Sequence, residues 1–285
     1  MANYGIYCTY EALKEYLNIP AAQTSDNKLL FKFAIQASDK LNAHCHNRYF
    51  YPIKQTRYYD YPCGVGLPAY SYQNSGQGFG FSTIPTPPLT YLDNTRLELD
   101  DDLLEVLSLT TQNGSQTITS SDYYLMTGDK YNFPPYDNIQ LKSDGTVTAF
   151  GYSGSTQKSN AVTGYWGYHE RWADAWQDSL DTVENNPLTS SGTSITVNDV
   201  DGVDLFGFTP RFQYQQLLKI EDEFLFVTGK DAGAANALTV IRGVNGTTAA
   251  AVGTLSAITL KAGCQIRGYF TAITLTSGGV VAYNL

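Results

Sequence analysis

The fold is decided by residues 9–52, which read TYEALKEYLNIPAAQTSDNKLLFKFAIQASDKLNAHCHNRYFYP. This stretch predicts a short helix over about residues 10–17 and a longer helix that starts near Ser25. Serine is a good N-cap residue, and the carboxylate of Asp26 is favourable in the first turn, near the positive end of the helix dipole. Apolar residues at spacings of three and four predict the buried face of the longer helix: Leu30, Phe33, Ala34, Ala37 and Leu41.

The chain from Pro52 to about residue 165 is predicted to be strand and loop. Short apolar runs are separated by Gly, Asn, Asp and Pro, which is typical of an antiparallel sheet. The predicted strands are residues 55–60, 96–99, 103–111, 116–119, 123–126, 138–141, 147–150 and 161–165. Residues 62–88 show no periodicity and are predicted to form a long loop. The fold class is therefore α+β, with an N-terminal helical hub packed on an antiparallel β-sheet.

A second small all-β domain is predicted after Pro187. Trp172, Trp176 and Leu180 recur at helical spacing, so we expect a short helix that ends at Asn185-Asn186-Pro187. Beyond this boundary, residues 193–197, 217–227 and 238–250 carry strand patterns.

Two features of this second unit predict specific contacts. The dipeptide Asn245-Gly246 is a strong turn signal. Arg242 is the only charged residue in its predicted strand, so it requires a partner, and Asp222 or Glu223 is the obvious candidate for a structural ion pair.

Composition excludes several classes of protein. The net charge is −9, with 18 basic against 27 acidic residues, which disfavours a protein that grips DNA phosphates. The chain is rich in Tyr (22) and Gly (25) but only 16% charged, which is typical of β-rich assembly proteins. The N-terminus has no signal-peptide pattern, and no apolar run is long enough to span a membrane. The four cysteines form no CxxC pair, which favours reduced thiols in a cytoplasm.

No catalytic, cofactor or metal site is predicted. The two histidines of His44-Cys45-His46 project in different directions on a helix and cannot chelate together. Asp100-Asp101-Asp102 is predicted to be a solvated turn, with cation binding as the less favoured alternative. Two further acidic groups are likewise predicted to be solvated, with cation binding as the less favoured alternative: Asp199/Asp201/Asp204 and Glu221/Asp222/Glu223. No nucleophile elbow, phosphate-binding glycine loop or pair of catalytic carboxylates is recognisable, so we expect no enzyme.

Four short motifs carry a family resemblance by their order and spacing. They are the helical pair that ends in Asn47-Arg48-Tyr49-Phe50-Tyr51-Pro52, then Arg57-Tyr58-Tyr59-Asp60, Asp122-Tyr123-Tyr124-Leu125, and Val162-Thr163-Gly164-Tyr165-Trp166-Gly167-Tyr168. Over roughly residues 9–180 the chain resembles the head-to-tail connector proteins of tailed bacteriophages, also called adaptor or head-completion proteins. Residues 188–261 resemble a small β module that recurs in phage virion proteins.

The resemblance implies a structural virion protein in the neck between capsid and tail, made in the host cytoplasm. It implies a homo-oligomeric ring of twelve copies beneath the portal protein, with a tail or further neck protein below. DNA would pass through the lumen without specific binding, and no membrane would be involved. Such rings form through heterologous interfaces that close by rotation.

The resemblance and the boundary at Pro187 together predict three segments. They are a connector domain (residues 1–187), an inserted β domain (188–261) and a C-terminal portal-docking segment (262–285). The last segment is apolar and β-prone at its end, so it suits addition to a partner's sheet, although folding back as an edge strand of its own domain is an open alternative. The predicted portal-docking residues are Ile266, Tyr269, Phe270, Ile273, Val280, Val281, Tyr283 and Leu285.

A tail-fibre or baseplate-type protein that binds a host glycan is the alternative function. Trp166, Trp172 and Trp176 would supply a stacking platform for a sugar, although a spacing of four on one helical face more often indicates core packing. The pair of helices at the N-terminus favours the connector, because fibres rarely begin with two packed helices.

Overall fold

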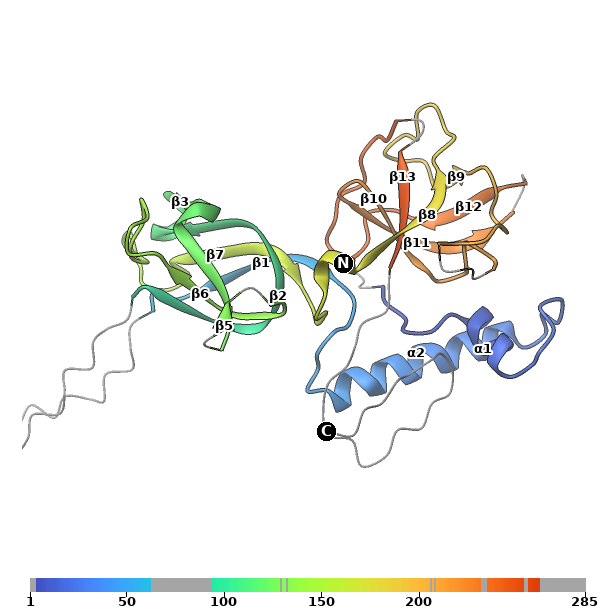
Figure 1. The fold of residues 1–285 in the computed structure, drawn as a ribbon, viewed down its shortest axis with the longest axis horizontal. Coiled ribbons are helices and arrows are strands. Elements are labelled where there is room, and N and C mark those ends of the chain that lie inside the picture. The colour runs from blue at the N-terminus through green and yellow to red at the C-terminus, as the bar shows by residue number, and fades with distance from the viewer. Residues whose placement is uncertain are drawn as a thin grey trace, which may run out of the picture. The chain divides into compact units, whose positions relative to one another are not determined.

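The protein is mostly β, with two α-helices and two antiparallel sheets (Figure 1). The computed structural model describes residues 4–62, 94–128, 130–131, 133–205, 207, 209–231, 235–253 and 256–261. The coarse α+β prediction is therefore confirmed.

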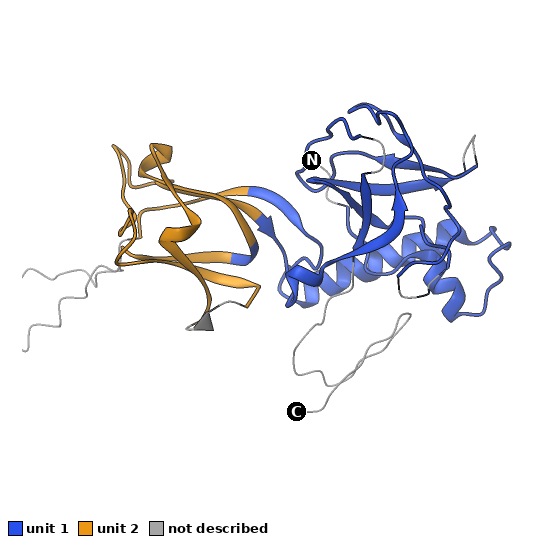
Figure 2. Ribbon diagram, turned by 45° about the horizontal axis from the view of Figure 1, so that its top comes forward, with its two compact units in different colours: residues 1–55, 101–104, 165–285 blue, residues 56–100, 105–164 orange. Residues whose placement is uncertain are grey.

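The chain forms two compact units (Figure 2). Unit 1 comprises residues 1–55, 101–104 and 165–285, and unit 2 comprises residues 56–100 and 105–164. The chain passes from one unit to the other within three strands, β1 (Ile53–Tyr59), β2 (Arg96–Thr111) and β7 (Asn160–Trp166). This division differs from the predicted one at residue 187, which lies inside unit 1.

The two predicted helices are present. Helix α1 (Tyr10–Tyr16) begins after Thr9, whose hydroxyl accepts a hydrogen bond from the Ala12 N–H (3.3 Å). Helix α2 spans Asn27–His44 and has Asp26 as its N-cap, with no side-chain cap hydrogen bond. The prediction that Ser25 caps this helix is therefore wrong by one residue.

The buried face of α2 is only partly the predicted one. The buried residues are four apart: Leu30, Ala34, Ser38 and Asn42. Two of these are polar because the segment before α1 crosses the helix there: the Tyr7 N–H donates to Ser38 Oγ (3.2 Å) and the Tyr7 hydroxyl donates to Asn42 Oδ1. Phe33, which was predicted to be buried, is 53% exposed.

Most of the first sheet lies in unit 2, and its order is β1-β7-β2-β6-β4-β5, with β3 paired to β2. Its remaining strands are β3 (Gln116–Ile118), β4 (Tyr123–Thr127), β5 (Lys130–Tyr131) and β6 (Tyr136–Leu141). Two predicted strands, residues 96–99 and 103–111, are one 16-residue strand, β2. The predicted strand at 147–150 is wrong, because its apolar signal comes from a loop whose Val147 and Phe150 are buried in the core.

The second sheet has six strands in the order β8-β13-β10-β11-β12-β9. They are β8 (Trp176–Thr182), β9 (Ser194–Thr196), β10 (Leu217–Ile220), β11 (Glu223–Lys230), β12 (Ala237–Ile241) and β13 (Ala257–Lys261). The Glu184 N–H, just after β8, donates to the Thr196 carbonyl (2.8 Å) in β9. This bond joins the two outer strands, so the sheet curls into a small barrel (Figure 1).

The predicted short helix before Pro187 is wrong. Residues Trp172–Asp174 form a single 3-10 turn and Trp176 begins β8. The four-residue spacing of Trp172 and Trp176 arises because both indoles pack against one apolar cluster, with ring centroids 6.4 Å apart. Since β8 pairs with β13, the sheet begins upstream of the predicted boundary.

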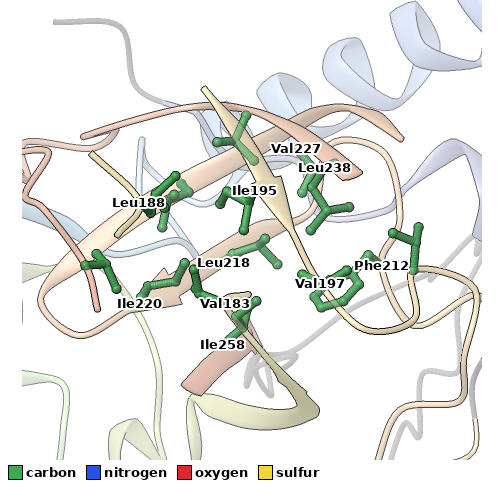
Figure 3. Close-up of a cluster of buried hydrophobic side chains, with 14 of the residues drawn as sticks. Val183, Leu188, Ile195, Val197, Phe212, Leu218, Ile220, Val227, Leu238 and Ile258 are labelled. Carbon is green, nitrogen blue, oxygen red and sulfur yellow. The ribbon is translucent and has the colours of Figure 1, made fainter. Parts of the chain in front are cut away.

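The barrel interior is a dense apolar core (Figure 3). It draws on every strand of the sheet except β8, together with the connecting segments. Its members are Val183, Leu188, Ile195, Val197, Val200, Phe212, Leu218, Ile220, Leu225, Val227, Leu238, Val240, Val252, Ile258 and Leu260. Apolar residues alternate along β10 and β13, but only β10 falls within a predicted strand, residues 217–227, and β13 was not predicted.

A second apolar cluster joins the barrel to the rest of unit 1. Phe224 and Phe226 of β11 lie in it together with Leu104 and Tyr165, and Tyr4 packs against it from the N-terminal segment. Residues 188–261 therefore share a core with residues outside the predicted β domain.

The predicted turn at Asn245-Gly246 is confirmed and has a second role. Both residues have positive φ (52° and 81°). The fully buried side chain of Asn245 accepts from the Tyr4 N–H (2.6 Å) and donates to the Tyr4 carbonyl (2.8 Å), as a neighbouring strand would. A side chain on Gly246 would collide with the Lys54 carbonyl, so glycine is required by close backbone approach as well as by φ.

Candidate functional site

The predicted portal-docking residues lie outside the described residues, so their role stays a prediction. They are Ile266, Tyr269, Phe270, Ile273, Val280, Val281, Tyr283 and Leu285. In the part of the chain that the structure describes, neither helix is both long and apolar enough to cross a membrane.

The His44-Cys45-His46 segment marks the end of a helix. His44 is the last residue of α2, Cys45 caps it, and His46 turns the chain with a φ of 59°. Among the described residues no group of three or more His, Cys, Asp or Glu side chains is placed to hold a metal ion.

The prediction that Asp100-Asp101-Asp102 is a solvated turn is wrong. All three residues lie inside β2, and the carboxylate of Asp100 has two partners on β1: Arg57 Nη1 (3.0 Å) and the Tyr59 hydroxyl (2.7 Å). Partial burial alone would raise the pKa of Asp100, but these two donors lower it overall. Burial raises the pKa of the Tyr59 hydroxyl, and the hydrogen bond to the Asp100 carboxylate raises it further.

Asp102 is 8% exposed and forms an ion pair with Arg48 (2.9 Å). The acidic run therefore continues a strand, because the carboxylates of Asp100 and Asp102 have cationic partners.

The predicted partner of Arg242 is confirmed as Glu223. The two side chains form a bidentate, almost fully buried ion pair with two N–O distances of 2.6 Å. The guanidinium also donates to the carbonyls of Thr189, Gly192 and Ala250 (2.7–3.0 Å). These hydrogen bonds join Arg242 to a strand and two loops of the same unit, which fits the predicted structural role.

A second buried ion pair orders the acidic loop that contains Asp199, Asp201 and Asp204. Asp181 accepts from Arg211 Nη1 (2.7 Å) and from the N–H groups of Asn198 (3.0 Å) and Asp199 (3.0 Å). Burial would raise the pKa of Asp181, but these donors lower it overall.

The three tryptophans do not form the platform required by the glycan-binding alternative. Trp166 is 1% exposed, and its Nε1 donates to the Gln55 carbonyl (2.9 Å). Trp172 and Trp176 are half-buried against the cluster that contains Phe224.

Trp176 also lines a shallow surface pocket of about 370 Å³, together with Lys219, Glu221, Ser256, Ala257 and Thr259. Its ring already contacts Phe224 (centroids 5.0 Å apart) and the Lys219 amine (5.8 Å), which leaves little ring surface for a sugar.

The exposed face of the helices is a feature that the sequence reasoning missed. Large apolar side chains that would normally be buried are about half exposed: Tyr16 (55%), Leu17 (50%), Leu29 (51%) and Phe33 (53%). The first two end α1 and the last two lie four apart in α2, on one face. The four-residue spacing of Leu29 and Phe33 was the available signal, but Phe33 was assigned to the buried face.

Comparisons with known proteins leave the family open. No protein-family model matches the chain, and no curated protein matches it.

Proposed function

We propose that this chain is a structural connector of a tailed-phage virion, which forms a ring beneath the portal and joins capsid to tail. The proposal starts from the resemblance of the four motifs. The structural observation that carries it furthest is the half-exposed apolar pair on one face of α2, Leu29 and Phe33, together with Tyr16 and Leu17 at the end of α1. Exposed large apolar side chains that share a face are typical of a surface that is covered by a partner.

In this proposal the two helices are the hub of the subunit. Contacts between α1 and the segment before β10 support that role: Thr9 Oγ1 donates to Gln213 Oε1 (2.5 Å), and Glu11 Oε1 accepts from the Tyr214 N–H (3.0 Å). The rings of Tyr10 and Tyr214 add a contact, with centroids 5.3 Å apart. These bonds hold α1 firmly, so its exposed end is presented in one orientation.

A closed ring requires two different complementary surfaces on each subunit. Unit 2 carries exposed large apolar residues of its own: Tyr58 (60%), Leu107 (43%), Tyr124 (43%), Phe133 (66%) and Tyr152 (53%). The presence of exposed apolar side chains on both units supports a subunit with several interfaces.

The acidic balance of the chain suits a DNA channel. A lumen rich in Lys and Arg would bind the phosphate backbone and slow the passage of DNA, whereas a net charge of −9 weakens such binding. The partners in this proposal are the portal protein, further copies of this chain and a tail or neck protein, and the location is the neck of the virion.

Mixing the purified chain with portal rings of the same virus tests the proposal by electron microscopy. We expect a second ring stacked beneath the portal, with matching symmetry. A chain truncated after Thr276 is the control for the C-terminal docking segment, and it should fold normally by circular dichroism yet fail to bind the portal. Specific sugar binding in a glycan screen, without portal binding, would instead support the tail-fibre alternative.

A further inference from the structure

Strand β8 contains a bulge that points a leucine into solvent. Asp178 pairs with Thr259 and Thr182 pairs with Ala257, so residues 179–181 oppose the single residue Ile258. Leu180 at the centre has a φ of 61° and is 54% exposed. A bulge of this kind redirects a side chain.

The conformation of Leu180 is costly. A left-handed backbone costs a branched L-residue roughly 1–2 kcal/mol, which Gly or Asn would largely avoid. The leucine side chain gains little in return within the subunit, because it is more than half exposed. The bulge places the neighbouring Asp181 against Arg211, but the Leu180 side chain takes no part in that contact. A side chain held outward in a strained conformation is a reason to expect a binding role for it.

The loop after β9 carries two more exposed apolar side chains, Val203 and Leu205. This loop is held by Arg211, which forms the ion pair with Asp181. Arg211, the partner of Asp181, donates from Nε to the Val203 carbonyl (3.2 Å) and from its backbone N–H to the Gly202 carbonyl (2.7 Å). Val203 is nevertheless 49% exposed and Leu205 is 55% exposed. Arginine thus fixes the loop backbone while the apolar side chains stay in solvent.

Acidic residues lie close in sequence to these three side chains. We define the barrel patch as Leu180, Val203 and Leu205 with the exposed residues Asp178, Asp199 and Asp201. Two of these acidic residues have a basic neighbour: Asp201 lies 3.5 Å from Lys230 and remains 74% exposed, and Asp199 lies beside Arg211, whose Nη1 donates to the Asp199 carbonyl (3.3 Å). The barrel patch is therefore apolar with an acidic rim.

Helix α2 offers the opposite combination. We define the helix patch as Leu29 and Phe33 with the exposed residues Lys28, Lys32 and Lys40. Because residues four apart share a face, the lysines form a row beside the apolar row, and both rows lie away from the buried face of α2. Against these lysines the helix carries one acidic residue, Asp39. The helix patch is apolar with a basic rim.

We propose that the occupant of the helix patch is the barrel patch of a second copy of this chain. Charge complementarity selects this occupant, since an acidic and a basic rim attract while two copies of either patch repel. The contact is heterologous, so each copy uses one patch of each kind and repetition produces a ring or an open chain. The inference rests on the proposed function only in that the ring would be built through this contact.

Two patch variants test the contact by analytical ultracentrifugation at up to about 1 mM, which detects millimolar dissociation constants. Phe33→Asp removes the helix patch, and Leu180→Asn with Leu205→Ser removes the barrel patch. We expect each variant alone to lose at least about tenfold in self-association. Mixed in equal amounts, the two variants should form a heterodimer and nothing larger, because the mixture contains one intact pair of patches.

A charge exchange provides the second arm. Lys32→Glu and Asp201→Lys should each weaken self-association, and their mixture should restore part of it. Leu180→Asn should also raise the unfolding midpoint by relieving backbone strain, which separates a lost contact from a damaged fold. Salt should weaken association of the wild-type chain.

Several outcomes overturn the proposal: no self-association of the wild-type chain, variants that associate as the wild type does, or mixed patch variants that form larger species. If Phe33→Asp leaves self-association unchanged while the barrel-patch variant weakens it, the barrel patch binds a surface other than the helix patch and the proposal is wrong. Portal binding is scored separately. If the chain self-associates as proposed but does not bind the portal, the proposed function is contradicted and the contact between copies is not.

Discussion

The barrel and helix α2 use their apolar residues in opposite ways. The barrel buries most of its apolar side chains, with Leu218, Ile220 and Leu225 fully inaccessible, and among its described residues it exposes few besides those of the barrel patch. Helix α2 buries Ser38 and Asn42 and leaves Phe33 half exposed. The barrel therefore has the features of an element stabilised from within, whereas α2 retains apolar area for a contact outside the subunit.

The largest expected effect tests the buried polar centre of the barrel. Arg242→Ala would leave Glu223 as an uncompensated buried charge, so we expect the free energy of unfolding to fall by about 3–5 kcal/mol. Urea denaturation measures this change. Arg57→Ala is the matched control, because it removes an ion pair whose Asp100 carboxylate is 68% exposed, and it should cost about 1 kcal/mol or less. Equal losses would contradict the distinction.

A matched pair of leucines tests the apolar comparison directly. Leu218→Ala in the barrel core should lower the free energy of unfolding by about 2–5 kcal/mol, because it leaves a cavity among buried neighbours. Leu29→Ala in α2 removes the same atoms from a residue that is 51% exposed, and it should change stability by no more than about 0.5 kcal/mol. A large loss from Leu29→Ala would show that the helix patch is already covered within the subunit.

The smallest expected effect concerns the attachment of α1 to the barrel. Burial raises the pKa of Glu11, and the Tyr214 N–H, Lys230 and Lys14 oppose the shift only partly. Since the folded pKa lies above the unfolded value of about 4.3, Glu11 favours the folded state most at acidic pH, and that contribution is lost as the pH rises through the raised pKa.

Glu11→Gln imitates the protonated carboxyl and keeps an oxygen for the Tyr214 N–H. Urea midpoints should match the wild type near pH 4 and exceed it near pH 7. Parallel curves for the two proteins across this range would show that Glu11 does not titrate with folding.

Local patterns predicted the elements whose signal is short-range. The two helices follow from their periodicity and end signals, and β9 and β12 from alternation between turn residues. Strands β10 and β11 were predicted as one strand over residues 217–227, and the turn between them was missed. The partner of Arg242 could also be predicted, because a single buried charge near one acidic cluster has few choices. The apolar residues of α2 could be recognised in the sequence, but the exposure of Phe33 could not be predicted, since apolar spacing does not distinguish a core from an interface.

The remaining features depend on contacts between residues far apart in the chain. Asp100 and Asp102 sit inside a strand because Arg57 and Arg48 neutralise them, and composition alone indicated a turn. Trp172 and Trp176 have the four-residue spacing of a helix because both pack against one apolar cluster formed largely by residues distant in the chain. The sequence by itself determined the two N-terminal helices and several of the strands through local periodicity. Only the tertiary structure decided which faces are buried, because desolvation and charge pairing depend on neighbours that the sequence order does not reveal.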